Sequence, residues 1–187
     1  MSTGNNTRAI NEIMGKAPMG LSLRFSEEES EAANDTWGAN CGPHALAAIL
    51  GKTLDEARVL LAPKFDEKFR ERGYGFTNPT MMGNALALAG RAFKLTKNLR
   101  TDQLCEGINR VQWEGPWLKP GVPPIVAYGH THWVACREGL VFCTAAPVYD
   151  FGGSQGWLTV EQWRCLIGAL CHREKFDGWH VTHHYAF

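Results

Sequence analysis

The stretch NDTWGANCGPHALAAIL, residues 34–50, decides the fold that the rest of the chain predicts. Its first part, up to Asn40, is small and polar, which predicts a loop. Cys41 follows, and Pro43 favours the first turn of a helix, where a residue needs no backbone N–H donor. The alanine and aliphatic residues after it form an apolar helical face, which Gly51 ends. We therefore expect Cys41 at a helix N-terminus, where the dipole and free N–H groups stabilise a thiolate.

The composition is that of one globular domain. The chain has 187 residues, of which 44% are hydrophobic and 20% charged, and a domain usually has about 100–200 residues. A net charge of zero argues against a nucleic-acid partner bound by phosphate neutralisation. No apolar run approaches the ~20 residues of a membrane span. We expect a flexible N-terminal segment, residues 1–18, a single domain over residues 19–187, and no nucleic-acid or membrane partner.

The N-terminus and the cysteines predict a cytoplasmic protein. Residues 1–8 are polar and lack the apolar core of a signal peptide. Six cysteines without paired spacing do not predict a disulfide framework, so we expect reduced thiols. A housekeeping protein, a phage or plasmid protein acting inside a bacterium, and an effector delivered by a route with no cleavable signal are all consistent with these features. Apart from Cys41, we expect four cysteines to be thiols in the core or near the surface: Cys136, Cys143, Cys165 and Cys171.

The pattern along the chain predicts helices first and strands second, an α+β domain. Residues 26–33 predict an acidic turn or a short helix. Helices are expected after the caps Thr53 (with Glu56 at capping-box spacing), Asn78, Thr101 (through Ile108) and Thr159 (with Gln162). Strands are expected at 20–25, 92–95, 125–128 and 179–185, and a hairpin at 132–137 and 140–144 across Glu138-Gly139.

A nucleophilic cysteine needs a base to take its proton and usually a third group to orient that base. His132 is the candidate base, because it begins an apolar strand in the sequence YGHTHWVAC, residues 128–136. His130 is its main competitor. His44, one helical turn after Cys41, is expected on the helix surface or in a local hydrogen bond.

Two motifs, NCGPHAL at residues 40–46 and GHTHWVA at residues 129–135, resemble the papain-like cysteine peptidase superfamily. The likeness is to the branch that includes bacteriocin-leader peptidases. It implies a papain-like α+β fold, with an N-terminal helical half that carries Cys41 packed on a C-terminal antiparallel sheet that carries His132. It also implies a peptidase, or a related thiol amidohydrolase, that acts on a peptide or protein amide without a metal or organic cofactor.

The same resemblance makes two further assignments. Family members usually carry a glutamine about six positions before the cysteine, where this chain has Asp35, and a carboxylate donates no hydrogen bond unless protonated. The oxyanion candidates are therefore Asn40, Asn34 and Asp35, together with the Cys41 backbone N–H. The orienting residue is assigned to Asp150, the first acid after the predicted hairpin. Thr144, or no third residue, is the rival.

Two other functions compete with the enzyme. The aspartate at position 35 and the missing acid at the strand end favour a catalytically impaired papain-like domain that binds a peptide or protein partner. A zinc protein is the third reading, because histidines are many, but no Cys-x-x-Cys pair occurs, so no metal site is expected. The histidines concerned are His130, His132, His180, His183 and His184. Loops 64–75 and 148–156 are the expected walls of the substrate cleft.

Overall fold

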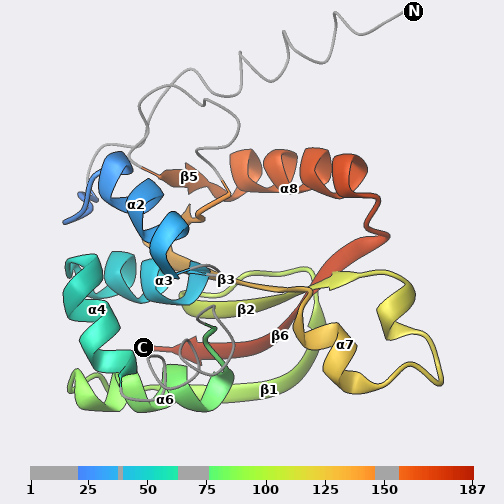
Figure 1. The fold of residues 1–187 in the computed structure, drawn as a ribbon, viewed down its shortest axis with the longest axis horizontal. Helices are drawn as coiled ribbons and strands as arrows, with labels where there is room; N and C mark the ends of the chain where they lie inside the picture. The colour runs from blue at the N-terminus through green and yellow to red at the C-terminus, as the bar shows by residue number, and fades with distance from the viewer. Residues whose placement is uncertain (1–20, 38–39, 63–75, 146–155) are drawn as a thin grey trace, which may run out of the picture.

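The computed structural model describes residues 21–37, 40–62, 76–145 and 156–187. The helices are α2 (Glu27–Trp37), α3 (Cys41–Leu50), α4 (Leu54–Leu61), α6 (Pro79–Leu88), α7 (Pro124–Tyr128) and α8 (Val160–Glu174), with the 3₁₀ turn η1 (Pro116–Leu118). The strands are β1 (Lys94–Thr101), β2 (Gly107–Glu114), β3 (Thr131–Arg137), β4 (Leu140–Phe142), β5 (Trp157–Thr159) and β6 (Gly178–Ala186) (Figure 1).

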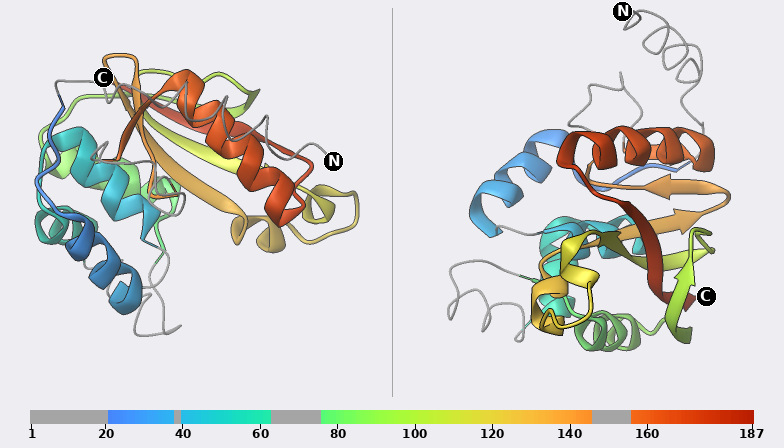
Figure 2. Two further views of the ribbon diagram at one scale, coloured as in Figure 1. Left: turned by 90° about the horizontal axis from the view of Figure 1, so that it is seen from above. Right: turned by 90° about the vertical axis from the view of Figure 1, so that its right-hand side faces the viewer.

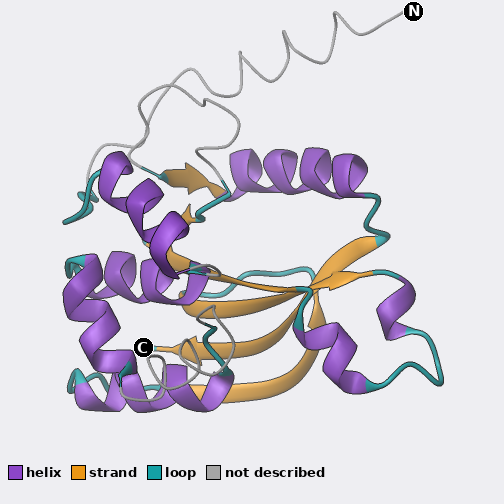
Figure 3. Ribbon diagram, in the orientation of Figure 1, coloured by secondary structure: helices purple, strands orange, loops and turns teal. Residues whose placement is uncertain are grey.

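The strands form one antiparallel sheet in the order β1-β6-β2-β3-β4-β5. Helices cover both of its faces: α3, α4 and α6 pack on one face and α8 on the other (Figure 2). Alternate residues of β3 enter the two resulting core clusters, so Trp133 faces α3 and Val134 faces α8. The predicted α+β class is confirmed, with helices and one continuous sheet in separate layers (Figure 3).

The helix starts predicted from side-chain caps are largely confirmed. Thr53 and Thr159 each form a complete capping box, with Glu56 and Gln162 respectively. The Asn78 side chain accepts a hydrogen bond from the Met81 N–H, and Pro79 is the first helical residue. These caps depend on contacts within three residues, so the local sequence specifies them.

The β3–β4 hairpin is also confirmed. Arg137 pairs with Leu140 across the two-residue turn. Glu138 and Gly139 have φ values of 55° and 75°, as a tight hairpin turn with two left-handed central residues requires. This register places Cys143 on the same face as His132, two positions along the neighbouring strand.

Two element predictions are wrong in type. Residues 101–108 do not form a helix: the Thr101 hydroxyl accepts from Gln103 N–H, and strand β2 begins at Gly107. Residues 125–128 belong to helix α7, because Pro124 at its first turn fixes a helical φ.

Three smaller predictions also change. Residues 21–25 form no strand, and β1 runs to Thr101 rather than ending at Leu95. Helix α2 extends through Asn34 and Asp35 to Trp37, so the first part of the opening stretch is helical. Segment 1–18, loop 64–75 and most of loop 148–156 lie outside the described residues. None of the described helices combines the length and apolar character needed to cross a membrane.

Glycine 107 provides a test of the sheet. Its φ is +116°, and a Cβ there would lie 2.0 Å from the Tyr185 carbonyl oxygen of β6. Gly107→Ala should therefore lower the free energy of unfolding by roughly 3 kcal/mol or more. Urea unfolding followed by tryptophan fluorescence measures this.

The matched control is Gly168→Ala in α8, where no atom lies within 4 Å of the new Cβ. It should raise the free energy of unfolding by about 0.5–1 kcal/mol, since alanine is the better helix former. Equal effects of the two substitutions would contradict the close β2–β6 approach.

Candidate active site

Cys41 is the first residue of α3, and Asn40 is its N-cap. The sulfur lies among three backbone N–H groups, those of Cys41, Gly42 and Trp133, and within electrostatic reach of the Arg110 guanidinium. Trp133 is the second residue after Thr131, where β3 starts. The residue is partly exposed. The structure thus places a reachable thiol where a helix start meets the strand that carries His132.

Burial raises the pKa of the Cys41 thiol above its ordinary value. The loss of hydration of the charged sulfur outweighs the lowering by the N–H groups and by Arg110. The N–H groups at the helix start do lower the pKa, as the sequence predicts, but burial outweighs them. At neutral pH the sulfur is a protonated thiol.

His132 faces the opposite layer of the sheet. Its ring stacks on Trp113, with ring centroids 5.9 Å apart, in the cluster under α8. Its Nε2 lies 3.2 Å from Cys143 Sγ in a hydrogen bond, and no hydrogen bond within the described residues joins it to Cys41. Burial lowers its pKa to about 4, so the imidazole is neutral at pH 7. The structure brings Cys41 to the strand of His132 but not to its ring.

Sequence reasoning missed Cys143 as the partner of His132. The signal was the predicted hairpin register, which sets the two residues diagonally on one face of β3 and β4. The proposed orienting residue Asp150 lies outside the described residues. Its rival Thr144 directly follows Cys143 and is partly buried.

The three oxyanion candidates differ in how far their side chains are exposed. Asn34 and Asp35 are exposed residues of α2. Asn40 is 4% exposed, and its Nδ2 finds no hydrogen-bond partner within the described structure. Asn40 is therefore the candidate that offers a buried, unused donor directly before Cys41.

Other buried polar atoms without partners gather around the start of α3. His44 donates through Nδ1 to the Asn40 carbonyl at 2.9 Å, which leaves Nε2 as a buried acceptor with no described partner. Thr77 Oγ1 is likewise unpaired in the described part of the chain, and it would lie 2.2 Å from a Cβ on Gly42. Arg110 Nε is a fourth such atom. Buried groups normally find partners, so these four atoms leave unused hydrogen-bonding capacity beside Cys41.

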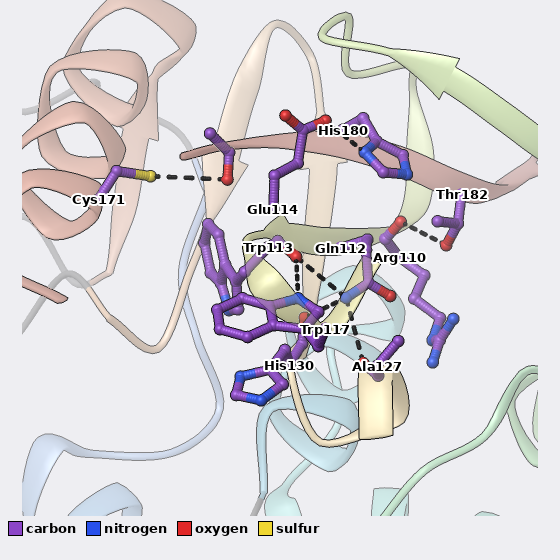
Figure 4. Close-up of polar contacts among 11 residues, drawn as sticks. Arg110, Gln112, Trp113, Glu114, Trp117, Ala127, His130, Cys171, His180 and Thr182 are labelled. Carbon is purple, nitrogen blue, oxygen red and sulfur yellow. Dashed lines mark hydrogen bonds and ion pairs between the residues drawn. The ribbon is translucent and has the colours of Figure 1, made fainter. Parts of the chain in front are cut away.

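Three of the other histidines have separate structural partners. His130 stacks on Trp117 with centroids 3.6 Å apart, His180 Nδ1 lies 2.7 Å from Glu114 Oε1, and His184 Nε2 donates to the Glu106 carbonyl (Figure 4 draws the first two). No three histidine, cysteine or acidic side chains among the described residues gather as metal ligands would.

Comparison with known proteins gives no relative: no family model, curated protein or solved structure matches this chain. The likeness of two short motifs to papain-like peptidases stays a prediction from the sequence. The case for a function rests on the arrangement around Cys41.

The neutral state of buried His132 predicts a pH dependence of stability. The unfolded chain takes up a proton near the ordinary histidine value of about 6.5, whereas the folded pKa is about 4. As the pH falls from about 6.5 to about 4, the wild type should lose on the order of 2 kcal/mol more unfolding free energy than His132→Asn.

Urea unfolding at several pH values measures this difference. His172→Asn, at an exposed site of α8, is the control and should follow the wild type. Parallel curves for the wild type and His132→Asn would contradict the buried neutral imidazole.

Proposed function

We propose that the protein is a thiol hydrolase that cleaves an amide bond in a peptide or protein, with Cys41 as the nucleophile. The finer proposal is a papain-like arrangement, with the cysteine on the helix α3 and the histidine on the strand β3. The observation that carries the proposal is the setting of the Cys41 sulfur, among backbone N–H groups at a helix start and beside the unused Asn40 amide. Such donors stabilise the oxyanion of an acyl-transfer reaction.

The reaction starts from neutral partners, because burial holds Cys41 as a thiol and His132 as a free base. The sulfur forms a bond to the carbonyl carbon while its proton passes to the His132 imidazole. The imidazolium then protonates the leaving amine as the C–N bond breaks, and water hydrolyses the thioester. The His132 ring lies on the opposite face of the sheet, so this step requires it to leave both Trp113 and Cys143 and to reach the Cys41 side of β3.

The first test removes the nucleophile. Cys41→Ala should lower turnover of a fluorogenic peptide pool by more than about a thousandfold, because the covalent step is lost. Circular dichroism should be unchanged, since the substitution is small. Cys165→Ala, at the partly exposed thiol of α8, is the matched control and should retain full turnover. Turnover by Cys41→Ala at the wild-type rate would contradict the proposal.

The second test concerns the base. Cys143→Ala removes the hydrogen bond that holds His132. If His132 is the base, Cys41 should then react roughly fivefold faster with iodoacetamide, because a hydrogen bond of about 1 kcal/mol no longer holds the base away. Cys143→Ser keeps a hydroxyl partner and should leave the rate near the wild-type value. If neither variant changes the rate at Cys41, His132 is not its base.

A second function is favoured by the hydrogen bond between His132 and Cys143. A domain whose histidine is held away from its cysteine would bind a peptide or protein partner without cleaving it. Absence of turnover, with Cys41 alkylated no faster than Cys165, would support this binding domain over the hydrolase.

A further inference from the structure

Arg110 is a buried cation that has no anionic partner among the described residues. It lies in β2, is 8% exposed, and directs its side chain to the face covered by α3. One guanidinium nitrogen, Nη2, donates to Thr131 Oγ1 at 3.3 Å, and Nε has no partner in the described part of the chain. Figure 4 shows the guanidinium running away from the hydrogen bonds that surround Gln112.

Among the described residues, none of the groups within electrostatic reach of Arg110 is a carboxylate. They are the thiol of Cys41 and the phenols of Tyr128 and Tyr185, together with His183. Burial, together with the nearby cations Arg110 and Lys97, lowers the pKa of His183 to about 4. His183 is therefore uncharged at neutral pH, and no described group balances the positive charge of Arg110.

A buried charge without a partner is costly, so its retention needs a reason. The start of the ten-residue helix α3 adds positive potential beside Cys41. A guanidinium offers Nε and an Nη nitrogen as a planar fork that matches a carboxylate. Here Nε is unused, and Thr131 supplies a hydroxyl next to the fork.

We propose that Arg110 anchors a carboxylate-binding subsite beside Cys41, so that the substrate carries a free carboxylate close to the amide that is cleaved. This inference rests on the proposed function, since it describes the substrate of that same site. A peptide ligand fits the surroundings, because α7 exposes the apolar side chains of Ile125, Val126 and Tyr128, and Tyr128 is within electrostatic reach of Arg110. The carboxylate belongs to an acidic side chain or to a chain terminus.

The test is protection of Cys41 from iodoacetamide, followed by mass spectrometry, which needs no turnover. Three short peptides of one apolar sequence serve as probes: one with a free C-terminus, one amidated, and one amidated with a glutamate inserted. We expect the plain amide to protect at least tenfold more weakly than the better carboxylate peptide. Stronger protection by the free C-terminus shows that the site binds a chain terminus, and stronger protection by the glutamate peptide shows that it binds an acidic side chain. Equal protection by all three peptides, or protection by inorganic phosphate alone, would overturn the carboxylate subsite.

Substitutions of Arg110 test whether the preference for a carboxylate depends on this residue. Arg110→Met should abolish the preference for carboxylate over amide, and Arg110→Lys should retain a reduced preference because it keeps the charge but not the fork. Arg137→Met, at an exposed arginine paired with Glu138, is the control and should keep the full preference. An unchanged preference in both Arg110 variants would overturn the assignment.

Thermal unfolding separates ligand binding from a structural role. Without ligand, Arg110→Met should unfold at the same or a higher temperature than the wild type, because it removes an unpaired buried charge. A marked fall in the unfolding temperature would instead make Arg110 a structural residue. Loss of turnover in Cys41→Ala and loss of carboxylate preference in Arg110→Met are independent outcomes, so the two proposals fail separately.

Discussion

Trp133 connects the parts of the molecule on which the candidate site depends. Its indole is buried in the core between the sheet and α3, and its Nε1–H donates to the Thr77 carbonyl at 3.0 Å, just before α6. Its backbone N–H points to the sulfur of Cys41. One side chain therefore holds β3, the start of α3 and the approach to α6 in a fixed relation. The position of the thiol follows from this packing and not from the helix alone.

The electrostatics of the site are set by burial more than by the helix dipole. Cys41 has the N–H groups and the cation that would lower its pKa, yet enclosure of the sulfur raises it. His132 and His183 are held neutral by the same desolvation. A low-dielectric site of this kind strengthens every interaction with a charge that enters it. The neutral state of Cys41, His132 and His183 therefore follows from their enclosure in the fold.

The sequence predicted the features that depend on neighbouring residues. The caps at Thr53, Asn78 and Thr159 and the β3–β4 turn were all predicted, since each is specified within three or four positions. Strand β2 was missed, because it is buried on both faces and shows no alternation of polar and apolar residues. Its polar side chains are satisfied only by the fold: Gln112, for example, donates to the carbonyls of Ala127 and His130.

The same limit applies to the candidate site. The positions of Cys41 at a helix start and of His132 at a strand start follow local rules, and both were predicted. The direction of the His132 ring was not, because it depends on Trp113 and Cys143 across the sheet. Arg110 gave no signal at all in the sequence, since an arginine is normally solvated. It becomes a candidate only through its burial in the fold, where no described residue supplies an anion.

The place of β6 in the sheet has a consequence for the strand that bears Arg110. This strand lies between β1 and β2, and the Thr182 hydroxyl donates to the Arg110 carbonyl across a separation of 72 residues. Without β6, the edge of β2 that faces away from β3 would have no partner. Contacts this distant in sequence carry a high cost in loop-closure entropy. The backbone of the strand that bears Arg110 is therefore held in place by the last segment of the chain.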